Sequence, residues 1–326
     1  MLNSKLYPFL VILFKYNSST MKAILYNEFG DIENGRYESI HDPELKAGTA
    51  LIHVLYAGIV PFDVKVLEKT IPMPHIKYPF IPGAEFSGVI VQISNTEDGF
   101  QVGDYVCANP KSYGGAFAEQ IVVSTEELSK IPIGLAFESA AACPVSSLAA
   151  WHALFEKGKL REGQNVLIVG ASGNVGSYAV QFANKAGATT YAVGSQQYQF
   201  AVLDMGANFY LDYKVENYLE GLPEMDLVVD LIGTADQNKL IPFIKEGGTI
   251  VSLVQQPDPE LLNLYNVNGF LLNSGPNPKQ LNEILDQIHK GEIKVNISKV
   301  LLMQDAVVGL KEVKSGKQNG KVLLKN

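Results

Sequence analysis

With 326 residues, the chain is long enough for about two domains. Hydrophobic residues make up 47% of it and charged residues 18%, a balance that is typical of globular proteins and excludes long disordered stretches. The net charge of −8 disfavours nucleic acid as a partner, because phosphate binding needs a basic face. Cys107 and Cys143 are the only cysteines, which excludes a disulfide framework and favours a cytoplasmic protein.

The first twenty residues stand apart from the rest. The apolar run from Leu6 to Phe14 is too short to span a bilayer, so no membrane association is expected. Lys5 precedes this run as in a signal peptide, but no small-residue cleavage site follows. Met21 opens "MKAILYNEFG" like a natural start. We expect residues 1–20 to be a disordered extension or a misassigned upstream start, with export as the alternative.

The chain then changes texture near residue 140. Residues 21–139 contain short β-like runs broken by Gly and Pro, at 49–58, 86–94 and 118–124. Beyond them, strand-like runs alternate with helical patterns: strands at 165–170, 189–194, 225–233 and 248–254, and helices at 176–187, 199–206 and 236–247. Strands joined by crossover helices predict a parallel, doubly wound sheet.

The last part of the chain leaves this sheet. A short β run at 267–272 closes the alternating region, 277–293 reads as a helix, and 320–326 reads as a strand returning to the first domain. The predicted domains are therefore 21–139 with 273–326, and 140–272. The run at 268–272 should lie at a sheet edge, and pairing with a second copy would protect that edge, so we expect a homodimer.

A glycine-rich turn follows the first strand of the alternating region. The strand Asn165–Val169 runs into "GASGNVG" over residues 170–176 and then into an apolar helical pattern. Glycines allow a pyrophosphate to approach the backbone closely, and the helix N-terminus offers free N–H groups. The alternative is an ordinary strand-to-helix turn. The surrounding strand, helix and next strand favour dinucleotide binding.

The end of the second strand predicts which dinucleotide is bound. No Asp or Glu occurs between Gly176 and Asp204 to hold the ribose 2′-hydroxyl of NAD. A 2′-phosphate meets no repulsion there and gains a donor from Ser195, so the predicted cofactor is NADPH. Tyr213 ends the third strand, where it either lies along the adenine ribose or packs on the surface. The predicted cofactor-binding residues are Gly170, Ser172, Gly173, Asn174, Val175, Gly176, Ser195, Tyr213, Gly233 and Lys321.

Several motifs in order resemble one known family over nearly the whole chain from residue 21. They are "AGIVPFDVKV", "YPFIPGAEFSGVI", "GGAFAEQIVV", "AAACPVSSLAAWHAL", "GASGNVGSYAVQFA" and "GKVLLK". The chain resembles the zinc-free quinone oxidoreductases of the medium-chain dehydrogenase/reductase superfamily. The resemblance implies an α/β fold in which a split, GroES-like, β-rich catalytic domain flanks a Rossmann domain, with nicotinamide in the cleft between them.

The chain lacks the ligands that zinc-dependent relatives use. Their G-H-E motif reads Gly83-Ala84-Glu85 here, and alanine cannot ligate a metal. The loop "AGIVPFD" has no cysteine, and no four-cysteine lobe is present. No pair among the five histidines has metal-ligand spacing; they are His41, His53, His75, His152 and His289. We therefore expect no metal.

Without zinc, the chemistry that the resemblance implies is hydride transfer from NADPH to a quinone or an α,β-unsaturated carbonyl, whose conjugated oxygen accepts the charge. Lys65 aligns with a lysine that contacts the nicotinamide ribose in related enone reductases and is our catalytic candidate; a solvated lysine is the alternative. Val60 replaces an asparagine that is common near the nicotinamide. Asp63 is expected to cap a helical turn.

Three tyrosines, Tyr56, Tyr78 and Tyr113, either line the cleft or pack within the fold. Two other functions stay open beside the zinc-free reductase. One is a non-catalytic NADPH-binding or sensing protein, since the common asparagine is lost. The other is a zinc alcohol dehydrogenase with unusual ligands.

Overall fold

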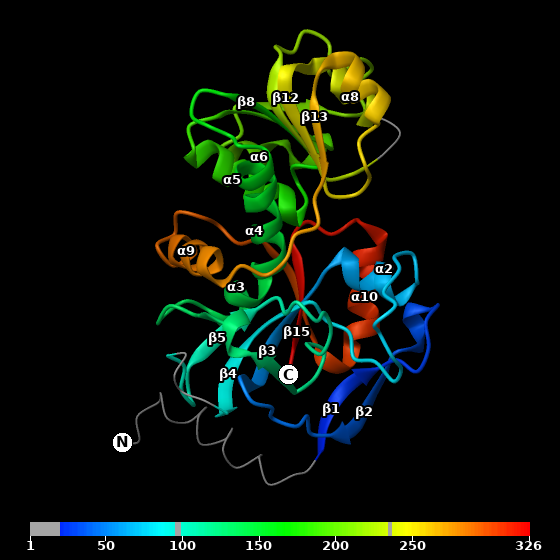
Figure 1. The fold of residues 1–326 in the computed structure, drawn as a ribbon, viewed down its shortest axis with the longest axis vertical. Coiled ribbons are helices and arrows are strands. Elements are labelled where there is room, and N and C mark those ends of the chain that lie inside the picture. Colours follow the sequence, from blue (N-terminus) through cyan, green and yellow to red (C-terminus); the bar gives the residue numbers. More distant parts are fainter. Residues whose placement is uncertain (1–19, 95–98, 234–236) are drawn as a thin grey trace. The chain divides into compact units, whose positions relative to one another are not determined.

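The computed structural model describes residues 20–94, 99–233 and 237–326, so the expectations for residues 1–19 lie outside it. The chain divides into two compact units (Figure 1). Among the described residues, unit 1 contains those up to Pro144 together with Pro276–His289 and Ile297–Asn326. Unit 2 contains Val145–Gly275 and Lys290–Asn296.

Unit 1 is built on a largely antiparallel sheet. Its strand order is β14-β15-β3-β4-β5-β7, β6 also pairs with β3, and only β14 and β15 run parallel. Strands β1 and β2 form a separate antiparallel pair. The bounds are β1 Thr20–Leu25, β2 Arg36–His41, β3 Thr49–Ile59, β4 Glu85–Ile93, β5 Tyr105–Ala108, β6 Gln120–Ser124, β7 Ser129–Lys130, β14 Ile297–Leu302 and β15 Lys321–Lys325.

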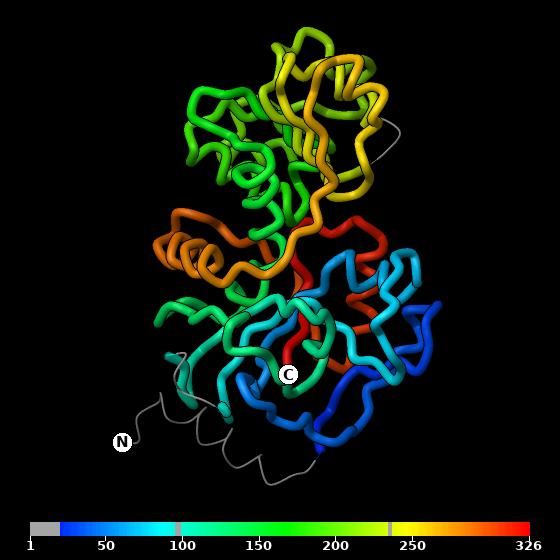
Figure 2. The backbone as a smooth tube through the Cα atoms, in the orientation of Figure 1, coloured from blue at the N-terminus to red at the C-terminus, as the bar shows by residue number. Residues whose placement is uncertain are grey.

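The two ends of the chain share the core of this unit. Figure 2 shows the red C-terminal segment running among the blue and cyan N-terminal ones. Strand β15 pairs with β3, which confirms that residues 320–326 form a strand returning to the first domain. The helices of unit 1 are α2 (Pro61–Leu67), α3 (Phe137–Ala142), α9 (Pro278–His289) and α10 (Ala306–Ser315). Helix α9 buries Leu281, Ile284, Leu285 and Ile288, a helical spacing that places one apolar stripe against the unit.

Unit 2 is a six-stranded sheet in which every pairing is parallel, with the order β10-β9-β8-β11-β12-β13. Its strands are β8 Asn165–Val169, β9 Thr189–Gly194, β10 Phe209–Asp212, β11 Met225–Asp230, β12 Ile244–Ser252 and β13 Asn268–Leu271. Its helices include α4 (Pro144–Trp151), the π-helix η3 (His152–Lys157), α5 (Asn174–Lys185), α6 (Gln199–Asp204) and α8 (Pro259–Tyr265). This confirms the predicted Rossmann-type α/β fold and places β13 at a sheet edge.

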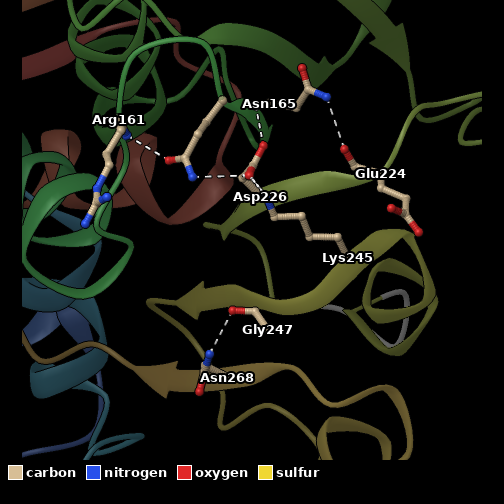
Figure 3. Close-up of polar contacts among 8 residues, drawn as sticks. Arg161, Asn165, Glu224, Asp226, Lys245, Gly247 and Asn268 are labelled. Carbon is tan, nitrogen blue, oxygen red and sulfur yellow. Dashed lines mark hydrogen bonds and ion pairs between the residues drawn. The ribbon is translucent and has the colours of Figure 1, made fainter.

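Polar side chains tie the amino-terminal ends of these strands together (Figure 3). The carboxylate of Asp226 accepts the backbone N–H of Asn165 at 2.8 Å and the amide of Gln164 at 3.2 Å, and it pairs with Lys245. The side-chain amide of Asn268 donates to the Gly247 carbonyl at 3.1 Å. These contacts join the strands at their amino-terminal ends, and the loops of the candidate site lie at the opposite, carboxyl ends.

One predicted helix is shorter than its pattern. The pattern at 236–247 gives only α7 (Gln237–Leu240) and a 3-10 turn (Ile241–Phe243) before β12 begins at Ile244. Pro242 has no N–H to donate to a helix. Ile244 pairs with Met225, so the residues from Ile244 onward form strand β12 although their sequence pattern is helical. Strand β14 and helix α10 had no predicted counterpart. None of the described helices is both long and apolar enough to cross a membrane.

The contact-defined units and the predicted domain bounds differ slightly. Residues 290–296 group with unit 2, whereas the predicted Rossmann domain covers 140–272. Gln181 explains this grouping, because its buried side chain accepts the Lys294 N–H at 2.7 Å and donates to the Lys294 carbonyl at 3.1 Å. The bounds of the functional domains stay a prediction.

Candidate functional site

The glycine-rich turn sits at the carboxyl end of β8 and requires its glycines. Gly170 has φ +88°, a conformation that favours glycine, and the N–H groups of Gly170 and Ala171 both donate to the Val193 carbonyl at 3.0 Å. A Cβ on Gly176 would lie 2.2 Å from the Gly170 oxygen. The first turn of α5 therefore packs directly against the loop, and no side chain fits between them.

The N-terminus of α5 is open for a ligand. Gly173 is its N-cap, and no side chain caps the helix there. Gly173 is exposed, while Ser172, Asn174 and Val175 are half-buried. Uncapped N–H groups on a bare backbone fit the pyrophosphate of a dinucleotide, because the helix dipole favours negative charge at this end.

The ends of β9 and β10 meet beside this loop. Gly194 lies opposite Asp212 in the β9–β10 register, and the Tyr213 N–H donates to the Gly194 carbonyl at 3.3 Å. The Tyr210 hydroxyl donates to the Ser195 carbonyl at 2.7 Å, and a Cβ on Gly194 would come within 3.6 Å of the Ser172 hydroxyl oxygen. Ser195 and Tyr213 therefore lie beside Gly194, and their contact with the adenosine ribose stays a prediction.

Sequence reasoning missed three residues at this point: Tyr210, Asp212 and Lys214. No acid lies between Gly176 and Asp204, but strand pairing brings Asp212, further along the chain, opposite Gly194. Burial first, then the charge of Asp212, raise the pKa of Tyr210 to about 12, which keeps its hydroxyl a donor. The parallel register of β9 and β10 brings these residues beside Ser195, and no spacing in the sequence indicates that register.

Gly233 lies at the carboxyl end of β11. The buried Asp230 carboxylate accepts the N–H groups of Ile232 at 3.1 Å and Gly233 at 3.0 Å, and it holds Gln237 and Ser252 on its other oxygen. Strand β11 is the neighbour of β8 on the side away from β9, so the strand order reverses between them. Ligands of open α/β sheets bind at such a switch point, outside the carboxyl ends of the strands.

The other two predicted site residues, Lys65 and Lys321, belong to unit 1. Lys65 is exposed on α2. Lys321 is 1% exposed, and its ammonium lies 2.5 Å from the Glu85 carboxylate, itself fully buried. The predicted contacts of both lysines with the cofactor stay predictions, and the ion pair gives Lys321 a structural role that the sequence did not indicate.

Asp63 links the loop after β3 to a distant loop. Its carboxylate accepts the Val60 N–H at 2.8 Å, which caps its own helix α2, and the Tyr113 hydroxyl at 3.0 Å. Burial raises the pKa of this carboxyl to about 7, against the opposing effect of these two hydrogen bonds. Asp63 is therefore the capping residue that we expected, and Tyr113 is a buried part of the fold.

The other tyrosines that the sequence singled out, and one of the histidines, also make contacts within the fold. The Tyr56 hydroxyl donates to Glu138 at 2.6 Å, and burial is the first cause that raises its pKa to about 12. Tyr78 packs edge-on against Phe29. His152 contacts the Ser274 hydroxyl at 2.7 Å through Nδ1. Within residues 20–94, 99–233 and 237–326, no three His, Cys, Asp or Glu side chains gather as a metal site would need.

Comparison with known proteins agrees with this geometry. Residues 46–133 match the family described as "Alcohol dehydrogenase GroES-like domain", and residues 205–324 match "Zinc-binding dehydrogenase". The chain is 29% identical to the 2-methylene-furan-3-one reductase of Solanum lycopersicum, over 94% of this chain and 79% of that protein. It is 30% identical to the chloroplastic NADPH-dependent alkenal/one oxidoreductase of Arabidopsis thaliana, over 84% of this chain and 71% of that protein.

Solved structures show the same fold. The quinone oxidoreductase from Coxiella burnetii superposes with a TM-score of 0.86 at 25% identity, over 94% of this chain and 99% of that one. Sequence, family and fold therefore agree that the chain belongs to the quinone oxidoreductase-like branch of the medium-chain dehydrogenase/reductase superfamily, a family of oxidoreductases.

Proposed function

We propose that this protein is an NADPH-dependent reductase of quinones or α,β-unsaturated carbonyls that works without zinc. The observation that carries the proposal is the uncapped N-terminus of α5 behind Gly170–Gly176, with Ser195 and Tyr213 beside it. The names of the tomato and Arabidopsis relatives, a furanone reductase and an alkenal/one oxidoreductase, support the substrate class.

NADPH, when bound, supplies a hydride to the conjugated system of the substrate. The chain's own part is to hold the cofactor. The backbone of Gly173–Gly176 would hold the pyrophosphate, and Ser195 and Tyr213 would contact the adenosine ribose. The turn at Gly233 borders the switch point next to β8. Lys65 remains our candidate for contact with the nicotinamide ribose.

Zinc independence rests on the donor set. Ala84 stands where zinc-dependent relatives have a histidine, and its methyl group offers no ligand. The adjacent Glu85 carboxylate is engaged by the Lys321 ammonium. We therefore expect exhaustive chelation to leave turnover unchanged, whereas loss of activity that zinc restores would contradict this part of the proposal.

The preference for NADPH rests on the missing acid on β9 and on Ser195. Two or three neutral hydrogen bonds to the 2′-phosphate predict a preference over NADH of about ten- to a few hundredfold. The test compares NADPH and NADH oxidation with quinones, enones and enals as acceptors. Ser195→Asp should reverse the preference, because it places a carboxylate against the phosphate. Equal or tighter binding of NADH by the unmodified protein would refute it.

A second candidate is a non-catalytic NADPH-binding protein. It is favoured by Val60, a buried apolar side chain where many relatives have an amide near the nicotinamide. NADPH binding without oxidation by any acceptor in the same panel would support it. A cytoplasmic location stays a prediction, since one of the relatives is chloroplastic.

A further inference from the structure

The loop after β9 lacks the positive charge that a phosphate needs. After Ser195 come Gln196, Gln197 and Tyr198, all uncharged. Neutral donors bind a phosphate more weakly than charged ones, roughly by a factor of two in interaction strength. A cation that strengthens binding of the 2′-phosphate would therefore have to come from another segment, and the described residues of unit 2 offer one.

The end of β10 brings such a segment to Ser195. Three contacts fix it there: the Asp212–Gly194 register, the Tyr213 N–H on the Gly194 carbonyl, and the Tyr210 hydroxyl on the Ser195 carbonyl at 2.7 Å. The Tyr210 hydroxyl occupies the space beside Gly194, since a Cβ there would lie 2.4 Å from it. The residue that follows Tyr213 is thus held beside the ribose end of the site.

That residue is Lys214. Its backbone N–H donates to the Asp212 carboxylate at 3.0 Å, which closes a tight turn, and its ammonium lies 5.9 Å from the centre of the Tyr213 ring. The side chain is exposed. Because the Lys214 ammonium is exposed and lies over the Tyr213 ring, it can reach a phosphate bound beside Ser195. One oxygen of the Asp212 carboxylate is already occupied by the Lys214 N–H.

We propose that Lys214 is the cationic partner of the 2′-phosphate of NADPH, supplied by the loop after β10 in place of the loop after β9. Tyr210 and Asp212 act as positioning residues: the first anchors the Ser195 backbone and the second orients the turn at Lys214. This inference rests on the proposed preference for NADPH, because it assigns the charge that completes the same site. The competing outcome is that Asp212 accepts the ribose 2′-hydroxyl of NADH.

The test uses binding of adenosine fragments by the full chain, which needs no turnover. Calorimetry measures the affinities for 2′,5′-ADP and for 5′-AMP, two probes that differ only in the 2′-phosphate. The variants are Lys214→Gln, Lys214→Arg and, as a control with the same loss of charge, Lys290→Gln, an exposed lysine of unit 2 away from both loops. Thermal melts confirm that each variant is folded.

We expect the unmodified protein to prefer 2′,5′-ADP and Lys214→Gln to lower that preference about tenfold, with 5′-AMP binding unchanged. Lys214→Arg and Lys290→Gln should keep it. The preference should also weaken with added salt in the unmodified protein and less so in Lys214→Gln. If Lys214→Gln keeps the preference, or weakens both probes equally, this inference is wrong while the proposed function stands. If the unmodified protein shows no preference, both are wrong.

Discussion

The phosphate loop of unit 2 and the buried polar groups of unit 1 are built in opposite ways. The loop is a run of seven consecutive residues, 170–176, and its chemistry comes from the backbone. The polar groups of unit 1 are side chains from distant segments: Asp63 and Tyr113 are 50 positions apart, and Glu85 and Lys321 are 236 apart. A site made from backbone leaves a local sequence pattern, whereas a network of side chains leaves none.

The two regions also respond differently to substitution. The loop excludes an added side chain at Gly176, because a Cβ there would collide with the backbone of Gly170 and Ala171. The buried polar groups of unit 1 do not tolerate removal of one charge of the Lys321–Glu85 pair, because the remaining buried ion still costs free energy for its transfer out of water. Substitutions in the two regions and at the sheet edges probe this difference, from the largest expected effect to the smallest.

Lys321→Met should be the most damaging. It leaves the Glu85 carboxylate buried without its cation, at a cost of about 3–5 kcal/mol in the free energy of unfolding. Lys299→Met is the matched control: its partner Glu312 lies at 2.5 Å, but both side chains are partly exposed, so the loss should stay below about 1 kcal/mol. Urea unfolding measures both.

The double variant Glu85→Gln with Lys321→Met separates charge from packing. Removing both charges should recover at least half of the loss. If Lys321→Met and Lys299→Met lower the free energy of unfolding equally, the buried ion pair matters no more to the stability of unit 1 than the partly exposed one.

Gly176→Ala should damage unit 2 and its ligand site together. Its Cβ would lie 2.2 Å from the Gly170 oxygen and 2.7 Å from the Ala171 backbone, so the loop must move. We expect a loss of about 1–3 kcal/mol in stability and of about a hundredfold in NADPH affinity. Gly275→Ala is the control, since a Cβ there meets nothing within 4 Å. Unchanged NADPH binding by Gly176→Ala would show that the loop at 170–176 does not bind the cofactor.

Asp63→Asn should change how stability depends on pH. Burial raises the pKa of Asp63 to about 7, above its value of about 4 in the unfolded chain, so the folded state binds the proton more tightly. The stability that this group contributes is complete below pH 4 and is lost as pH rises to about 7. The difference between the unmodified protein and Asp63→Asn should therefore fall by up to about 1.4 kcal/mol per pH unit in that range. A constant difference would mean that Asp63 is ionised throughout.

The edge strands of the two sheets give the smallest effect on stability. Phe270 and Leu271 on β13 are 37% and 47% exposed, and Val300 on β14 is 43% exposed. We expect Leu271→Lys to convert a homodimer into monomers, visible by sedimentation at micromolar concentration, with a change in stability within about 0.5 kcal/mol. Val300→Lys should leave the dimer intact. A monomeric unmodified protein would contradict the predicted homodimer.

Much of the fold was predictable because each element obeys a local rule. Thr189–Gly194 and Asn165–Val169 are buried apolar runs, and the helix at 278–289 shows one apolar stripe. The helix predicted at 236–247 ends early because the residues from Ile244 onward pair with β11, and Pro242 interrupts the helical pattern just before them.

The part of the candidate site that the sequence predicts most directly is the phosphate loop, because one segment builds it. Gly170–Gly176 carry a pattern that backbone geometry requires. Strand pairing brings Asp212 and Lys214 close to Ser195. Packing of unit 1 brings Lys321 to Glu85. Neither contact corresponds to a recognisable spacing in the sequence. Long-range contacts of this kind need three-dimensional information.

The place of β15 in the sheet also sets the timing of folding during synthesis. Tyr56–Ile59 on β3 pair with β15, and the Asn326 side chain donates to the Val54 carbonyl 272 positions earlier. At about 5–20 residues per second, the ribosome takes roughly 15–50 s to make that stretch. Throughout this interval part of the β3 edge has no partner, while the strands of unit 2 emerge and can fold. The newly made chain therefore depends on protection of one open strand edge until its last residues appear.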